Sequence, residues 1–414
     1  MAYGTAAKAR AYADRVAKVE KRLAALTDGR DDPDVPLAPI MTTWFWGMVK
    51  RLPSTEQVGK MLKDPLWRRK MGLSLDQGGG PDMAGRALDQ LSIEELNEVL
   101  LDAFFDMVRA GTLKPGPYGF RCVGVDANEL FKSEKRHCDN CQVREKTVTR
   151  NGEDVKVPEY FHQAVCVAWF GKDFAFPIAW ELVEPGGSEL NTAIRLLDRL
   201  LPRLHQSIDL VLGDALYCCR PFLRTIVRHH CDPLVICLNT TEMEQEMDFL
   251  MANEKGRSVL GGKLLAWEML SSAWETDIGT KLRLIHLKRD YFEPEWAKVR
   301  KNLRVVTTVL ADKLPLAQAW GIGRSRWHIE NPVFNELTRD YSLEHNFRHS
   351  TPAIVALLVI RSLALGFTKA YHLFATARSK DVPETLLDWF QSIFERDWVR
   401  YLDSDLDVAV PGSG

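Results

Sequence analysis

Two apolar segments of the chain each end in an aspartate, and this pattern limits the fold more than any other feature. Residues 122–126 (CVGVD) and 210–214 (LVLGD) both have the composition of a buried strand followed by a carboxylate. An aspartate just beyond a buried strand lies at the carboxyl edge of an open α/β sheet, where such sheets bind ligands. A single aspartate of this kind more often caps the next turn. Two of them, Asp126 and Asp214, on strands expected to be neighbours predict a binding site.

The segments around these aspartates follow an α/β order. After Pro115-Gly116-Pro117 the pattern changes from helical to strand-like. We expect strands at 120–125, 160–170, 173–181, 208–212 and 233–238, and helices at 189–204 and 218–228. This order predicts an α/β fold with a mixed sheet. Further along, short alternating segments at 281–289 and 303–310 predict strands, and helical patterns return at 316–341 and 352–374.

The domain organisation follows from these changes of pattern. The first 114 residues have helical spacing, and two capping boxes, at Ser54 and Ser92, mark helix starts. We expect a small helical, locally basic region at 1–114, an α/β domain at 115–238 and 316–375, a β-rich insertion at 239–315, and a C-terminal helix and frayed tail at 376–414.

The charge balance excludes one class of DNA-binding protein. The 414 residues carry 54 basic and 56 acidic side chains, a net charge of −2, so the chain does not bind nucleic acid through bulk positive charge. Any DNA contact must come from local patches. Residues 50–70 form one such patch, with Lys60, Lys63, Arg68 and Arg69 as candidates. A second patch lies in residues 1–30, for which a solvated helix face is an equal alternative.

Cysteine content and hydropathy indicate an intracellular protein. Eight cysteines in 414 residues are too few for a disulfide scaffold, and no charged-then-apolar signal sequence opens the chain. The most apolar stretch, 353–367, is interrupted by Arg361, and the run before it is far shorter than the roughly 20 residues of a membrane span. This stretch is expected to form a buried core helix, with no membrane contact.

A third carboxylate stands in residues 326–331 (RWHIEN). In a helix, Arg326 lies one turn before Glu330 on the same face, which alone describes an ordinary surface ion pair of little energetic value. A helix that returns to a sheet carrying two aspartates completes a group of three carboxylates instead. Such a group suits Mg²⁺, which prefers hard oxygen ligands, and two ions about 3.5–4 Å apart can flank a phosphodiester. Carboxylates this close repel each other without a cation, so their convergence would itself indicate a metal site.

Asp126, Asp214 and Glu330 resemble the Asp-Asp-Glu (DDE) triad of cut-and-paste insertion-sequence transposases, whose catalytic domain is ribonuclease-H-like. The matching segments are RWHIEN (326–331), FNEL (334–337), YSLEHNF (341–347), GDALY (213–217) and ELN (189–191). The first three are similar to one block of a bacterial branch of the family and are the most specific. The 116 residues from Asp214 to Glu330 (330 − 214) are similar to the spacing in the branch with a β-rich insertion there. The resemblance covers residues 118 to 350.

The resemblance implies a DNA transposase that cleaves transposon ends and joins the 3′-hydroxyl to target DNA by two-metal phosphoryl transfer. Asp126, Asp214 and Glu330 would then be catalytic and hold Mg²⁺ or Mn²⁺. Arg326 would steady a phosphate or Glu330, and Arg339 would contact DNA. The implied partners are double-stranded DNA, as terminal inverted repeats and target, and further copies of the chain in a homodimer or larger synaptic complex. The implied location is the bacterial cytoplasm, at the nucleoid when DNA is bound.

Two other functions stay open. A non-mobile ribonuclease-H-like endonuclease on the same scaffold would cleave without preferring particular ends. A decayed or domesticated transposase would bind DNA without cleavage, and some positions favour this: Gly323 stands where many relatives have Tyr, and Leu337 and Thr338 where they have Lys. Pro332, two residues after Glu330, is also expected to bend or restart the helix.

A separate group of cysteines and histidines follows the first strand. Cys138 and Cys141 form a Cys-x-x-Cys, a spacing that lets two thiolates hold one Zn²⁺. A tetrahedral site needs two more ligands, for which the candidates are His162 and either His137 or Cys166. The chain has no second Cys-x-x-Cys, so two free thiols in a polar hairpin are an equal alternative. A zinc here is expected to be a structural clip, not a catalytic ion.

Overall fold

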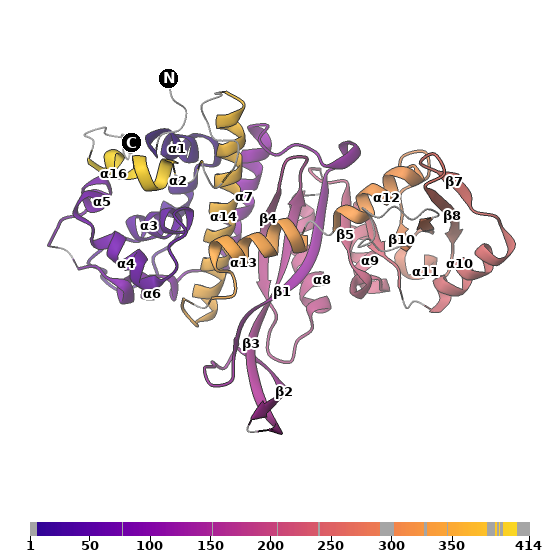
Figure 1. Cartoon of the computed structure of the whole chain (residues 1–414), viewed down its shortest axis with the longest axis horizontal. Helices are drawn as coiled ribbons and strands as arrows, with labels where there is room; N and C mark the ends of the chain where they lie inside the picture. Colours follow the sequence, from indigo (N-terminus) through magenta and orange to yellow (C-terminus); the bar gives the residue numbers. More distant parts are fainter. Residues whose placement is uncertain are drawn as a thin grey trace.

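A ten-stranded mixed sheet forms the middle of the molecule. The computed structural model describes residues 6–76, 78–150, 152–204, 206–238, 241–289, 302–326, 329–345, 347–378, 386, 389 and 392–403. Within these residues the strand order is β2-β3-β1-β5-β6-β10-β9-β8-β7, with β4 also paired to β3. Helices from both ends of the chain gather at one end of this sheet, and β7–β10 lie at the other (Figure 1). The predicted α/β fold with a mixed sheet is confirmed.

The centre of the sheet is built from apolar segments that are buried on both faces. They belong to β1 (Cys122–Ser133), β3 (Glu153–Phe170), β4 (Ala175–Leu182), β5 (Leu210–Gly213) and β6 (Asp232–Ile236), of which β1 and β3 are buried over only part of their length. Strands β1, β5 and β6 are parallel, whereas β3 is antiparallel to both β1 and β4. A Cβ at Gly124 would lie 2.3 Å from the ring of Phe170, so only glycine allows β1 and this ring to pack as they do.

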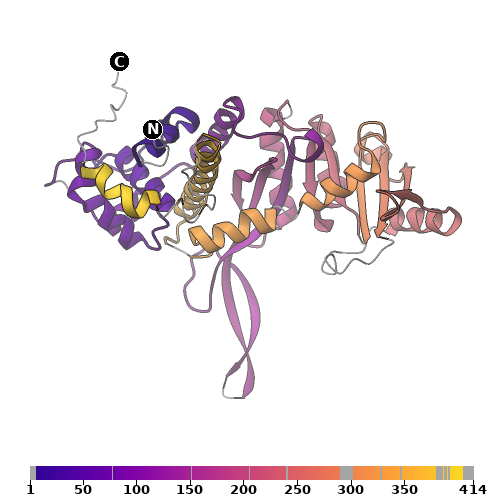
Figure 2. The ribbon, with the colours of Figure 1, turned by 45° about the horizontal axis from the view of Figure 1, so that its top comes forward.

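Strands β2 and β3 form a long hairpin that projects from the body of the molecule (Figures 1 and 2). Strand β2 (Gln142–Arg150) pairs with the first half of β3. Its side chains are mostly exposed and polar, and Arg144 and Lys146 both make ion pairs with Glu159 across the hairpin. The sequence indicated only a polar hairpin here, because an exposed strand lacks the apolar run that marks a buried one.

Helices cover the sheet and supply its core. α8 (Glu189–Leu204) and α9 (Arg220–Arg228) fall close to the predicted ranges. α7 (Ile93–Arg109) and the long α14 (Thr351–Thr376) both contact β4. α14 is long and apolar enough to cross a membrane, but nearly all of its most apolar window is buried inside the protein. The prediction of a buried core helix for this stretch is confirmed.

The N-terminal region is helical, as expected. Its helices are α1 (Ala6–Tyr12), α2 (Val19–Ala24), α3 (Leu37–Val49), α4 (Thr55–Lys63), α5 (Pro65–Lys70), α6 (Pro81–Leu88) and α7. Ser54 and Ser92 cap α4 and α7 by accepting hydrogen bonds from the backbone N–H groups of Gln57 and Glu95, as predicted. The C-terminal α16 (Trp398–Asp403) packs beside α1, where Arg10 donates to the Tyr401 hydroxyl. The predicted frayed tail after 403 lies outside the described residues.

The segment after β6 extends the same sheet. Strand β10 (Asn302–Thr307) pairs with β6, and β9 (Leu282–Arg289), β8 (Leu264–Ser271) and β7 (Arg257–Val259) follow outward. Helix α10 (Thr241–Asn253) and the short α11 (Glu275–Ile278) pack nearby. The sequence analysis did not predict α10, although its apolar side chains recur at the helical spacing of Met243, Met247 and Leu250.

Candidate active site

Asp126 and Asp214 lie at the same edge of two parallel strands. Gly124 on β1 pairs with Leu212 on β5, and each aspartate stands two residues beyond its member of that pair. Asp214 directly follows β5, as predicted, and accepts a hydrogen bond of 2.8 Å from the backbone N–H of Leu216. Asp126 was predicted to follow its strand, and this was wrong, because β3 pairs with β1 as far as Ser133. The buried part of β1 nevertheless ends just before Asp126.

Glu330 reaches this edge from a helical segment near the C-terminus. α12 (Leu316–Ser325) ends at Arg326, and a π-helical stretch (Ile329–Asn335) carries Glu330 and Pro332 before α13 (Glu336–Tyr341) begins. Trp327 and His328 lie outside the described residues. The stretch Ile329–Asn335 packs on β1 and β4, which places Glu330 beside the sheet edge. Pro332, where a bend or a restart of the helix was expected, lies inside the π-helical stretch, and the α-helix begins four residues later.

A single guanidinium group joins two of the three carboxylates. Arg326 makes an ion pair of 2.9 Å with Glu330 Oε1 and a longer one of 3.4 Å with Asp126 Oδ2. Its side chain is 7% exposed, so the charge is held inside the protein, whereas that of Glu330 is 41% exposed. The predicted pairing of Arg326 with Glu330 is confirmed. The contact with Asp126 shows that the two segments converge.

The pKa of Asp126 responds to its burial and to the charges around it. Its pKa is raised to about 7, chiefly because the side chain is buried. The backbone N–H of Ala127 and the charge of Arg326 lower this pKa, while the charges of Asp214 and Glu330 raise it. All three carboxylates therefore lie within one electrostatic neighbourhood, and a further cation there would favour their ionised forms.

A fourth carboxylate, Glu189, lies beside this group and was not singled out from the sequence. It begins α8 and accepts hydrogen bonds of 2.8 Å from the Tyr217 hydroxyl and from Gln163 Nε2. Burial and the charge of Asp214 raise its pKa. Glu189 could have been identified from the sequence, since Glu189 and Tyr217 both fall within segments that resemble the family.

The predicted DNA-contacting side chains differ in exposure. Lys60, Lys63 and Arg69 are exposed on α4 and α5. Arg68 is 2% exposed and donates to the carbonyl oxygens of Leu62 and Ser74, so the structure contradicts its assignment to a DNA-binding surface. Arg339 is exposed and pairs with its neighbour Asp340.

Acidic side chains of the protein itself neutralise part of the positive charge of residues 1–30. Arg10 pairs with Glu20, and Arg22 pairs with Asp102 and Asp106 of α7. These arginines hold helices together, so the basic character of residues 1–30 overstates the charge that this region presents to a ligand.

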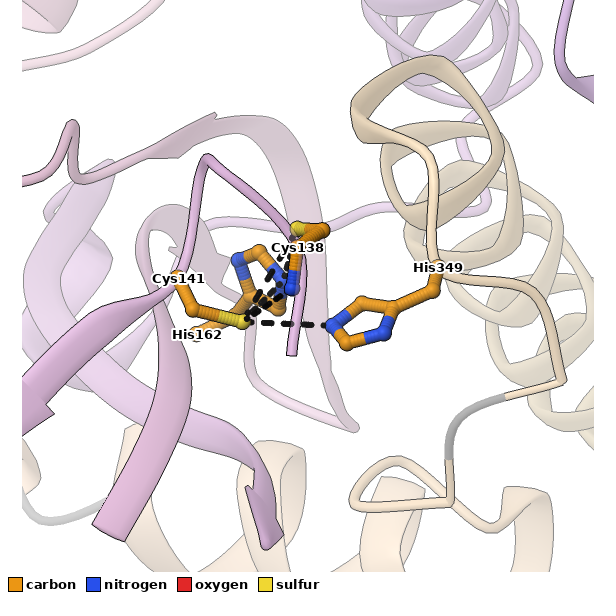
Figure 3. A group of neighbouring side chains, drawn as sticks. All are labelled: Cys138, Cys141, His162 and His349. Atoms are coloured by element: carbon orange, nitrogen blue, oxygen red, sulfur yellow. Dashed lines mark hydrogen bonds between the residues drawn. The ribbon is translucent and has the colours of Figure 1, made fainter. Parts of the chain in front are cut away.

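Three of the four predicted zinc ligands come together, and the fourth was wrong. Cys138, Cys141 and His162 form a cluster whose other member is His349, just before α14 (Figure 3). His137 instead stacks on the ring of Tyr160, with centroids 4.4 Å apart. The alternative Cys166 lies in the sheet opposite Asp126. His349 was missed because it follows Cys141 by 208 residues and belongs to no local metal-binding motif.

The comparison with protein families shows which family the chain belongs to. The family model described as "Transposase DDE domain" matches residues 147–367, which is more than half of the 414 residues and includes Asp214 and Glu330. A search of curated proteins found no match. Since the match spans most of the sheet and of the helices that cover it, the predicted ribonuclease-H-like fold is confirmed, and the chain belongs to the transposase DDE domain family, as expected of a DDE-class insertion-sequence transposase.

Proposed function

We propose that this chain is an active DNA transposase that cleaves the ends of a mobile element and joins the freed 3′-hydroxyl to target DNA. The observation that carries the proposal is the pair of contacts made by Arg326. One guanidinium contacts both Asp126 and Glu330, which are 204 residues apart in the chain (330 − 126), at the edge where Asp214 also ends its strand. Family membership supports metal-dependent DNA chemistry at such an edge.

The donor groups fit Mg²⁺ or Mn²⁺. Asp126, Asp214 and Glu330 offer only carboxylate oxygens, the hard ligands that these cations prefer. Burial is the chief reason that the pKa of Asp126 is raised, and the charges of Asp214 and Glu330 raise it further. A cation bound there would favour the ionised carboxylates. When bound, such ions activate the attacking oxygen and stabilise the leaving oxygen of a phosphodiester.

The other side chains of the site position these groups. Arg326 keeps a fixed positive charge and presents forked donors, which suit both a carboxylate and a phosphate oxygen. In this structure it orients Glu330 toward β1. Tyr217 and Gln163 hold the Glu189 carboxylate near enough to Asp214 for the two charges to interact.

The exposed lysines of α4 are proposed to contact DNA phosphates. Lys60 and Lys63 are exposed, and Lys60 pairs only with the exposed Glu56 one turn away among its described ion pairs. Replacing both with Gln should weaken DNA binding severalfold and reduce the dependence of log affinity on log salt concentration by about two, since each phosphate contact releases a counterion. Equilibrium binding at a series of salt concentrations measures this slope, and an unchanged slope would remove α4 from the interface.

Asp214→Asn is the most direct test of the proposed activity. Asn keeps an oxygen that can accept the hydrogen bond from Leu216 N–H, so the turn should persist while the charge is lost. Removing a ligand of the reacting ions should reduce strand cleavage at least ~10³-fold. The measurement is cleavage of duplexes taken from the sequences that flank the gene, with Mg²⁺ or Mn²⁺ present, and DNA binding should stay within twofold of the native protein.

The same assay separates the alternatives. Asp232→Asn is the matched control, because Asp232 begins the neighbouring strand β6 at the opposite end from the site. Cleavage of random duplexes as fast as the flanking ends would indicate a non-mobile endonuclease. Binding without cleavage by the native protein would indicate a domesticated copy, and equal cleavage by Asp214→Asn and native protein would exclude Asp214 from catalysis.

A further inference from the structure

We propose that Cys138, Cys141, His162 and His349 form a structural Zn²⁺ site that fastens the base of the β2–β3 hairpin to the segment before α14. The four ligand atoms all lie within 4.8 Å of one another. They come from two distant parts of the chain, and their side chains point toward one shared point (Figure 3). This site is separate from the carboxylates and does not depend on the proposed transposase activity.

Four of the six distances between the ligand atoms match those around a tetrahedral zinc. Zn–S bonds of about 2.3 Å and Zn–N bonds of about 2.0–2.1 Å place two sulfurs about 3.8 Å apart and a sulfur and a nitrogen about 3.6 Å apart. The two Sγ atoms are 3.8 Å apart. His162 Nε2 is 3.5 Å from Cys138 Sγ and 3.4 Å from Cys141 Sγ, and His349 Nε2 is 3.3 Å from Cys141 Sγ. Four protein ligands close the coordination shell, which is typical of structural rather than catalytic zinc.

The local backbone brings the two cysteines together in a geometry that favours metal binding. The N–H of Cys141 donates to the carbonyl of Cys138, which closes a tight turn between them. The N–H of Cys138 points at Cys141 Sγ at 3.4 Å. A backbone donor aimed at a sulfur stabilises a thiolate, the form that binds metal.

A second contact joins the same two segments. Asn140, inside the Cys-x-x-Cys turn, donates to the Thr351 hydroxyl in the first turn of α14 at 2.9 Å. Beside it, Ser350 caps α14 and also donates to Asp89, at the end of α6. The cluster therefore lies where the hairpin base, α14 and the N-terminal helices meet, and a metal there holds these parts in one arrangement.

The test uses the full chain purified without chelators under reducing conditions. Elemental analysis should find about one zinc per chain, which would survive conditions that remove Mg²⁺. His349→Ala should lose most of this zinc during dialysis against a chelator that leaves the native protein loaded. His137→Ala is the matched control, because His137 is nearby in sequence but stacks on Tyr160 outside the cluster, and it should keep its zinc.

A rescue variant guards against simple misfolding. His349→Cys replaces one zinc ligand with another, so it should retain zinc, and its Co²⁺-substituted form should show stronger thiolate-to-cobalt absorption than the native protein. A native protein that contains no zinc and takes up none on reconstitution would overturn the proposal. So would His349→Ala holding zinc as firmly as His137→Ala, or a Cys138–Cys141 disulfide in the protein isolated from cells.

Discussion

The carboxylate site and the Cys/His cluster both join the β1–β3 region to the C-terminal third of the chain, but they balance charge differently. The carboxylates are hard donors, and Arg326 already supplies them with a protein cation. The Cys/His cluster consists of softer donors, and four of its six ligand-atom distances match a tetrahedral ion. The carboxylate site thus keeps a permanent internal counter-charge, whereas the stability of the cluster is expected to depend on a bound ion.

The two sites also differ in access. Glu330 is 41% exposed, so its carboxylate can meet a ligand from solvent. Cys141 and His162 are buried, and the four ligands leave no open coordination position for a substrate. The exposure of Glu330 suits the proposed ions that act on DNA at the carboxylate site. The burial of the Cys/His cluster suits the proposed structural zinc.

The segment between the two sites is anchored by a buried arginine. Glu330 and His349 are 19 residues apart (349 − 330), and the chain between them passes Leu343 and His345. Arg361 of α14 is 3% exposed and donates to the backbone carbonyls of both of these residues. Arg361 therefore holds this segment against α14, and we expect a change at Arg361 to reach both sites.

Replacing Arg361 should disturb both sites and have the largest effect on folding. Arg361→Ala removes charge-assisted hydrogen bonds to Leu343 and His345 and leaves a cavity, and we expect a loss of about 2–4 kcal/mol in the free energy of unfolding. Denaturant unfolding measures the loss. Zinc should also exchange faster, and DNA cleavage should fall.

The control for this change lies two residues after the same helix. Arg378→Ala, beyond the C-terminal end of α14, should alter stability by less than about 0.5 kcal/mol because the side chain is exposed. Loss of stability with both metal sites intact would show that the segment from Glu330 to His349 does not link them.

Replacing Arg326 should affect only the carboxylate site. Arg326→Lys keeps the charge but loses the fork that contacts Asp126 and Glu330 together, so cleavage should fall about tenfold to a hundredfold. Single-turnover cleavage at saturating metal measures this, and zinc content should be unchanged. Arg86→Lys is the matched control, since exposed Arg86 pairs only with Asp82 one turn away among its described ion pairs, and it should stay within a fewfold of native. Full activity in Arg326→Lys would mean that charge alone suffices.

Local sequence patterns predicted the parts of the carboxylate site that depend on neighbouring residues. The end of β5 at Asp214 follows from a short apolar run, and the Arg326–Glu330 pair follows from helical spacing. The length of β1 did not, because its polar half is a strand only through pairing with β3. That pairing joins residues far apart in the chain, which no local pattern contains.

The same limit explains the missed histidine. Cys138 and Cys141 form a recognisable local motif, and His162 lies on the adjoining strand, opposite Phe131 of β1. His349 arrives from the other side of the domain, and only the packing of α14 brings it there. His137 was the nearer candidate in sequence, but its position in the turn directs its ring onto Tyr160. Nearness in the sequence therefore favoured His137, whereas tertiary packing brings His349 to the two cysteines.

The smallest predicted effect lies at the far end of the two strands that carry Asp126 and Asp214. Arg121, just before β1, pairs with Asp209, just before β5. Burial raises the pKa of Asp209, but hydrogen bonds from Arg121 outweigh it and hold that pKa below its ordinary value. Because both side chains are more than a third exposed, Arg121→Met should cost only about 0.5–1 kcal/mol at pH 7.

The pH dependence of this pair identifies its contribution. A carboxylate whose pKa is lower in the folded state stabilises the protein above its unfolded pKa and loses this effect as pH falls through its folded pKa. The difference in unfolding free energy between native protein and Arg121→Met should therefore be present at pH 7 and shrink below about pH 4. Urea unfolding across this range measures the difference. Arg224→Met, which changes an exposed side chain on α9, is a control that should show no such trend. DNA cleavage and zinc content of Arg121→Met should also be measured. If its cleavage falls far more than its stability while zinc is retained, the Arg121–Asp209 pair sets the spacing of the carboxylates at the other end of β1 and β5, and the Cys/His cluster does not depend on that pair.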